Sequence, residues 1–96
     1  MNDIETKKAI VGGLLEIMKA AVEEENRLML VGVKSKLGFL QDKVWGCIKA
    51  VVGMPVEEAA GGFQSDLWLK DALDFAVGKL SKEEAVNRIV NWDKRV

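Results

Sequence analysis

The chain has 96 residues, of which 49% are hydrophobic and 30% are charged, with one cysteine and no histidine. This length supports one hydrophobic core and is too short for two, and the mixed composition excludes disorder along the whole chain. The 14 basic and 15 acidic residues leave a formal net charge of −1, which points neither to a polyanionic partner nor to a membrane surface. We therefore expect residues 1–96 to form a single domain.

An amphipathic helix is predicted at the start of the chain, because apolar residues recur with helical spacing from Ile10 to Val22. Gly12 and Gly13 interrupt this pattern, which indicates either that a neighbouring element approaches closely or that the helix bends there. Glu25 would point into the apolar face if the helix continued. A break is therefore predicted at residues 24–26.

A second long helix is predicted from Asn26, which can cap it, to about Val52. Cys47 shares the helical phase of the apolar residues, so we expect its thiol to be buried. Small residues on the opposite side would let another helix approach closely. An alternative interpretation makes residues 27–33 a strand, although the sequence offers no clear partner strand.

Three further helices are predicted in the second half of the chain. Pro55 suits a first helical position, and the glycine pair that follows limits this short helix to residues 55–60. Ser65 is predicted to cap the next helix. Residues 81–84 read Ser-Lys-Glu-Glu, a capping box that begins a last helix expected to bury Ala85, Val86, Ile89 and Trp92.

These elements predict an all-α fold: a long antiparallel helical hairpin plus a short helix and two further helices, arranged as a compact helical bundle. The longest uncharged stretches are shorter than the roughly 20 apolar residues of a membrane-spanning helix. The lone cysteine excludes an intrachain disulfide, and no secretory signal is recognisable. A cytoplasmic location without membrane contact is the expectation.

The residues offer no convincing catalytic or metal-binding set. Histidine, the commonest general base and metal ligand, is absent, and Cys47 therefore has no histidine to activate its thiol. The consecutive acids Glu23, Glu24 and Glu25 would fan out around a helix instead of converging on a metal ion. We expect no enzymatic activity, no metal and no cofactor.

Charge is distributed unevenly along the chain. Residues 26–56 carry five basic groups and one acidic group, whereas the segments on either side are net acidic. One interpretation is a nucleic-acid-binding protein that uses this basic segment, with Trp45 stacking on a base. The simpler interpretation is a basic helix packed between acidic ones, and we prefer it.

The apolar residues exceed what the predicted core faces can hold, so a binding surface is expected. Trp45, Trp68, Phe75 and Phe39 fall at the margins of those faces or outside them, and aromatic side chains in such places are typical of protein interfaces. The alternative interpretation is that the short helix and the loops cover these rings. The prediction is a small regulator or inhibitor, of the kind that phages and mobile elements encode, which binds an unidentified protein and forms a homodimer. Its contact residues are predicted to be an aromatic centre and a polar rim of lysines, namely Trp45, Trp68, Phe75, Lys36, Lys43 and Lys49.

Overall fold

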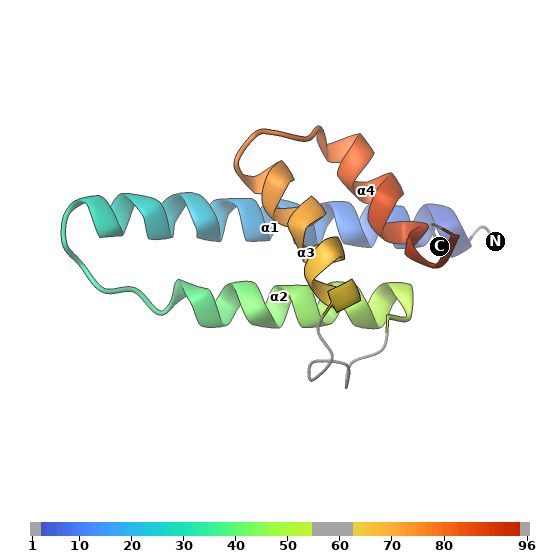
Figure 1. Cartoon of the computed structure of the whole chain (residues 1–96), viewed down its shortest axis with the longest axis horizontal. Helices are drawn as coiled ribbons and strands as arrows, with labels where there is room; N and C mark the ends of the chain where they lie inside the picture. The colour runs from blue at the N-terminus through green and yellow to red at the C-terminus, as the bar shows by residue number, and fades with distance from the viewer. Residues whose placement is uncertain (1–2, 55–62, 95–96) are drawn as a thin grey trace.

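A computed structural model describes the backbone of residues 3–54 and 63–94 and the side chains of residues 3–54 and 69–94. This part of the chain folds into four α-helices and a closing 3-10 turn, and it contains no strand, which confirms the all-α prediction. The strand alternative for residues 27–33 is therefore wrong. The elements are α1 (Asp3–Leu30), α2 (Leu37–Val52), α3 (Phe63–Ala76), α4 (Lys82–Val90) and the 3-10 turn Trp92–Lys94 (Figure 1).

The predicted antiparallel hairpin is present as α1 and α2, which run side by side along the long axis of the molecule (Figure 1). Helices α3 and α4 lie across the half of the hairpin that is nearer the N-terminus. Helix α1 contacts each of the other three helices, so it is the central element of the bundle. The other end of the hairpin extends beyond α3 and α4.

The core lies between the hairpin and the two shorter helices. The largest fully buried side chains come from three different helices, and they are Val11, Leu15, Met18, Ile48 and Ile89. Burying each of these groups favours folding by about 1.5–3 kcal/mol relative to leaving it in water. On α4, Ala85, Val86 and Ile89 are buried as predicted, while Trp92 is only partly buried.

The predicted helix break at residues 24–26 is wrong, because α1 continues to Leu30. Glu25 does lie on the side that faces α2, but it does not break the helix there. Its Oε1 accepts a hydrogen bond from Nε2 of Gln41 on α2 at 2.8 Å. Gln41 thus satisfies the carboxylate of Glu25 from the neighbouring helix, so the helix continues at little cost. Asn26 lies inside α1, and the prediction that it caps a new helix is therefore wrong.

The hairpin turn lies at residues 31–36. Gly32 has a φ of 78°, and its N–H donates to the Met29 carbonyl while the Val33 N–H donates to the Leu28 carbonyl. This Schellman arrangement ends α1 at a left-handed residue, which glycine adopts without steric cost. The Oγ of Ser35 then accepts the Leu37 N–H at 2.9 Å and so supports the first turn of α2.

The two interior glycines of α1 differ in their surroundings. Gly12 is buried, and a Cβ placed there would lie 3.1 Å from Cε of Lys82 on α4, so the predicted close approach is confirmed at this position. Gly13 is exposed, and nothing lies within 4 Å of the place its Cβ would take. The glycine pair therefore serves helix packing through its first member only.

We expect Gly13→Ala and Gly46→Ala each to raise the free energy of unfolding by about 0.5–1 kcal/mol. Both glycines lie within helices and have open space around the position of a Cβ, so alanine removes the entropic cost of glycine without a clash. Urea unfolding followed by circular dichroism measures the change. A lower midpoint in either variant would contradict the assignment of that glycine to an uncontacted helical position.

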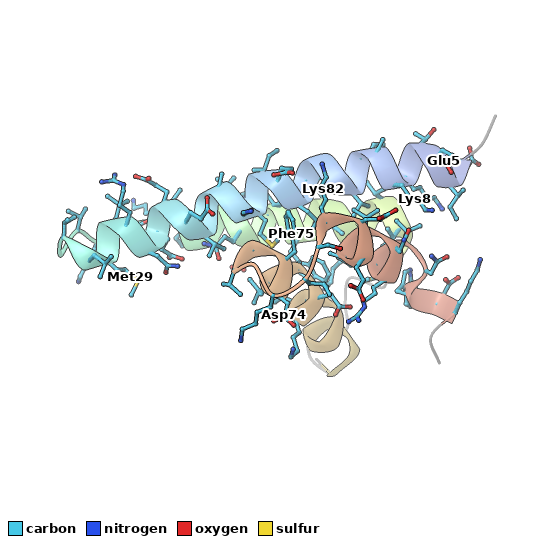
Figure 2. The ribbon with its side chains drawn as sticks, turned by 90° about the horizontal axis from the view of Figure 1, so that it is seen from above. Glu5, Lys8, Met29, Asp74, Phe75 and Lys82 are labelled. Carbon is cyan, nitrogen blue, oxygen red and sulfur yellow. The ribbon has the colours of Figure 1, made fainter. Side chains whose placement is uncertain are left out.

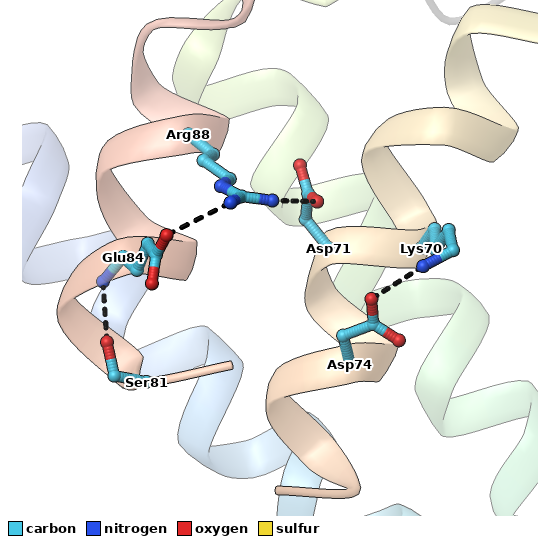
Figure 3. Close-up of polar contacts among 6 residues, drawn as sticks. All are labelled: Lys70, Asp71, Asp74, Ser81, Glu84 and Arg88. Atoms are coloured by element: carbon cyan, nitrogen blue, oxygen red, sulfur yellow. Dashed lines mark hydrogen bonds and ion pairs between the residues drawn. The ribbon is translucent and has the colours of Figure 1, made fainter. Parts of the chain in front are cut away.

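The last helix begins as predicted. The Oγ of Ser81 accepts the Glu84 N–H at 3.1 Å, while the Glu84 carboxylate pairs with Arg88 at 3.0 Å (Figure 3). Helix α3 begins at Phe63, so Ser65 lies inside that helix and the prediction that it is a cap is wrong. The short helix predicted at residues 55–60 lies outside the described residues.

Candidate functional site

The two described aromatic residues of the predicted contact surface are core residues. Trp45 is 7% exposed and Phe75 is 6% exposed, so the prediction that they lie at an exposed margin is wrong. Because α3 and α4 cover one side of the hairpin, the core is wider than a single helix stripe and includes marginal positions. Phe75 is further covered by Lys19 of α1, whose Nζ lies 5.3 Å from the ring centroid. The side chain of Trp68 lies outside the described residues.

The three lysines of the predicted rim differ in their exposure. Lys36 and Lys43 are exposed, whereas Lys49 is only 9% exposed. Lys49 follows the buried Trp45 by one helical turn, so its side chain starts from the covered side of α2. The prediction that Lys49 forms part of an accessible rim is therefore wrong.

Cys47 also differs from the prediction, because its side chain is exposed. It lies between two positions of α2 that face different ways, the exposed Gly46 and the buried Ile48. Val44, Ile48 and Val52 are buried while Cys47 is exposed, so the predicted apolar stripe of α2 is covered only in part. Helical phase alone did not reveal how much of the stripe is covered.

The largest group of exposed apolar side chains lies at the free end of the hairpin. Figure 2 shows Met29 at this end, far from Glu5 and Lys8 near the N-terminus and away from Phe75 under the shorter helices. We call this group the tip patch: Leu30 (88% exposed), Phe39 (67%), Met29 (66%), Val31 (62%), Val33 (47%) and Leu40 (40%).

The local sequence explains why the tip patch is exposed. Leu30 and Val31 stand at the end of α1 and in the turn that follows it, and Phe39 stands in the first turn of α2. α3 and α4 lie toward the other end of the hairpin (Figure 1). Clustered apolar exposure of this kind marks an interaction site more often than single exposed residues do.

Basic side chains surround the tip patch. Lys34, Lys36 and Lys43 are exposed, and within the described residues none of them forms an ion pair. Arg27 instead pairs with Glu24 on the same helix. This hydrogen-bonded pair lowers the pKa of the Glu24 carboxyl, chiefly through the hydrogen bond and also through the charge of the guanidinium. The three lysines therefore remain available as cations.

Two neighbouring grooves, which share Glu25 and Ser35, lie at the tip. A groove of about 420 Å³ is lined by Glu25, Met29, Gly32, Val33, Lys34 and Ser35. A second groove of about 470 Å³ is lined by Glu25, Ser35, Gly38, Phe39, Gln41 and Asp42. Both grooves are shallow surface features that combine apolar and polar groups, so they can receive side chains of a partner.

Away from the tip, the ion pairs lie within a helix or join neighbouring helices, as Lys82 of α4 does with Glu16 of α1. Nζ of Lys70 lies 2.7 Å from Oδ2 of Asp74 one turn along α3, and this hydrogen bond is the main cause of a lowered pKa at the Asp74 carboxyl (Figure 3). Exposed pairs of this type add little to stability. They do not assemble a polar site.

We expect Lys70→Ala to raise the pKa of Asp74 toward the ordinary value of an aspartate, because the variant removes the hydrogen bond and the nearest positive charge. NMR titration of the Asp74 side-chain carboxyl carbon measures this shift. Because the pKa of Asp74 is lower in the folded state than in the unfolded state, the pair stabilises the fold slightly at pH values above the unfolded-state pKa. This stabilisation is lost as the pH falls through the folded-state pKa. An unchanged Asp74 titration in Lys70→Ala would contradict the pair.

The described residues contain no group of three or more acidic or cysteine side chains placed to hold a metal ion. None of the described helices is long and apolar enough to cross a membrane. Cys47 is the sole cysteine, and the chain has no histidine that could activate it. The tip patch with its lysines is thus the strongest candidate site in the described part of the chain.

We compared the chain with protein families, curated proteins and solved structures. No family model, no curated protein and no solved structure matches the chain.

Proposed function

We propose that the protein works by binding another protein through the tip patch, and that it acts on that partner as a regulator or inhibitor. The observation that carries this proposal is the exposure of six large apolar side chains at one end of the hairpin. Protein interfaces combine an apolar centre with a polar rim, and the tip has both.

The exposed area at the tip makes such binding favourable. Phe39 and Leu30 are the most exposed side chains of the patch, and apolar area buried against a partner contributes roughly 25 cal/mol per Å². Interfaces concentrate their binding energy in a few aromatic and aliphatic anchors near the centre. We assign that anchoring role to Leu30 and Phe39.

Nucleic-acid binding through residues 26–56 is the alternative, and the structure supports it less. Trp45, which would stack on a base, is buried, and so is Lys49. The basic groups that remain at the tip surround apolar side chains, which gain little from a phosphate backbone. Salt-dependent binding of single-stranded or duplex DNA by the purified protein would favour this alternative.

We expect Leu30→Asp and Phe39→Asp each to abolish specific capture of the partner without lowering the stability of the fold. Immobilised wild-type protein and variants are exposed to a lysate of the source organism, and the retained proteins are compared by quantitative mass spectrometry. Val77→Asp is the matched control, because Val77 is also exposed (55%) but lies beyond the end of α3.

Two results would overturn the proposed function. Either the tip variants retain the same proteins as the wild type, or nothing retained by the wild type is absent from an unrelated control resin. Circular dichroism melting of each variant shows that lost capture is not caused by unfolding.

Self-association is a second candidate function, and a separate surface supports it. We call this surface the open face. On α1, Ile10 is 44% exposed and Ile17 is 47% exposed, two helical turns apart. They point away from Gly12, which packs against Lys82 of α4. By helical spacing Gly13 and Ala20 share this side of α1, and we assign to the same face the exposed side of the neighbouring α2, which carries Gly46, Cys47 and Ala50; all five are exposed.

A homodimer through the open face should give, by light scattering, twice the 10.6 kDa mass of one chain. Ile17→Asp should return the mass to that of one chain, since a charge at the centre of an apolar interface is strongly disfavoured. Val77→Asp again serves as the control that leaves the mass unchanged. A wild-type mass of one chain at millimolar concentration would remove the homodimer.

A further inference from the structure

We infer that the site on the partner is an apolar protein segment flanked by carboxylates, which seats its apolar side chains on the tip patch and pairs its acids with Lys34, Lys36 and Lys43. This inference rests on the proposed function and adds the chemistry of the partner to it.

The lysines stand on both sides of the apolar centre. Lys34 and Lys36 belong to the turn that follows Val33, and Lys43 follows Phe39 by four residues on α2. Residues four apart on a helix share one face, so Lys43 and Phe39 lie on the same side of α2. The cations therefore border an apolar surface, which is the arrangement of an interface rim.

The acidic groups near the tip do not cancel these cations. Glu24 is paired with Arg27, and Oε1 of Glu25 accepts the hydrogen bond of Gln41. Asp42 is the remaining acid of residues 26–56. The three lysines have no ion pair within the described chain, and the carboxylates of Glu25 and Asp42 keep their charge, so three cations outnumber two anions and the tip has a small positive excess that attracts and orients an acidic partner.

The shape of the tip favours a protein segment over an anionic bilayer. Grooves of about 420 and 470 Å³ lie at the tip, and a protein segment gains affinity by packing into such features with close shape complementarity. Both are lined by Glu25, and the larger also by Asp42. Three exposed lysines beside these carboxylates are fewer than the roughly 4–8 Lys and Arg residues of segments that bind anionic headgroups.

The test places a photoreactive benzoylphenylalanine at position 31, which is 62% exposed and lies beside the anchor Leu30, in the full-length chain expressed in the source organism. Mass spectrometry of the irradiated product identifies the joined peptide. We expect that peptide to contain apolar residues flanked by Asp and Glu. Lys34→Glu/Lys36→Glu should lower the yield of the cross-link about tenfold, since two attractive charge contacts become repulsive.

The control is Lys7→Glu/Lys79→Glu, which reverses two exposed lysines far from the tip and should leave the yield unchanged. A cross-link that persists in Lys34→Glu/Lys36→Glu, or that joins a peptide without acidic residues, overturns this inference but leaves tip binding intact. A product made only with lipid or nucleic acid overturns both. The absence of any cross-link to a protein also overturns the proposed function.

Vesicles of phosphatidylserine and phosphatidylcholine provide the second measurement. The purified wild-type protein should remain in the supernatant when such vesicles are sedimented at physiological salt. Sedimentation with the vesicles that is lost in Leu30→Asp would show that the tip binds an anionic bilayer, and the inference would fall.

Discussion

Replacing Trp45 with alanine is expected to lower the free energy of unfolding by about 3–5 kcal/mol. Trp45 is 7% exposed and belongs to the core cluster that joins all four helices. Truncation removes the transfer free energy of the indole and leaves a cavity that the neighbouring helices can fill only in part. A domain of this size is stable by only about 5–15 kcal/mol, so the loss is a large part of the total.

Phe39→Ala is the matched control for Trp45→Ala. Both residues are aromatic and lie on α2, but Phe39 is 67% exposed. An exposed side chain has little to lose on truncation, so the free energy of unfolding should change by no more than about 0.5 kcal/mol. Urea unfolding, followed by the fluorescence of the remaining tryptophans and by circular dichroism, measures both changes.

The two variants separate stability from binding. Phe39→Ala should weaken capture of the partner while the melting temperature stays constant, and Trp45→Ala should lower the melting temperature sharply. If Trp45→Ala were as stable as the wild type and failed to bind, Trp45 would be a contact residue as the sequence predicts. The burial of Trp45 would then be wrong.

The sequence predicts the fold class well because its strongest signals are local. Ser81 lies three residues before Glu84, and this spacing correctly marks the start of α4. The apolar periodicity from Ile10 to Val22 correctly indicates a long first helix. These features depend on neighbouring residues, so no knowledge of the tertiary structure is needed to recognise them.

The position of the hairpin turn depends on a contact that the sequence does not display. Glu25 disturbs the apolar phase of α1, and a break is the natural interpretation if it has no partner. Gln41 supplies the partner from α2. The true turn has its own signals, namely Gly32 as a left-handed helix end and Ser35 two residues before Leu37. These signals would have located the tip patch.

The exposure of Trp45, Phe75 and Lys49 was mispredicted for a related reason. Helical periodicity shows which side of a helix is apolar, but it does not show how many neighbouring helices cover that side. α3 and α4 cover the hairpin near its open end and leave its turn bare, so Trp45 and Phe75 are buried while Phe39 and Leu30 are exposed. Only the arrangement of the helices decides which marginal residues reach the surface.

Arg88→Ala is expected to lower the free energy of unfolding by about 1–2 kcal/mol. Arg88 on α4 reaches across to α3, where its Nη1 lies 3.4 Å from Oδ1 of Asp71 (Figure 3). The Asp71 side chain is only 8% exposed, so its carboxylate cannot replace the lost partner freely with water. Leaving a buried acceptor with fewer partners costs about 1–3 kcal/mol, and the long distance and partial exposure of Arg88 place this case at the lower end.

Glu84→Ala is the control, because it leaves the Asp71–Arg88 pair in place and removes the exposed pair with Arg88 and one acid of the first turn of α4, so it should cost less than about 1 kcal/mol. The double variant Asp71→Ala/Arg88→Ala completes the cycle. It should be less destabilised than the sum of its two single variants by about 1 kcal/mol, since it removes the buried charge together with its partner. Additive effects in urea unfolding would mean that Arg88 contributes no coupling between α3 and α4. The junction of the two short helices would then depend on apolar contacts such as that of Ile89 with the core.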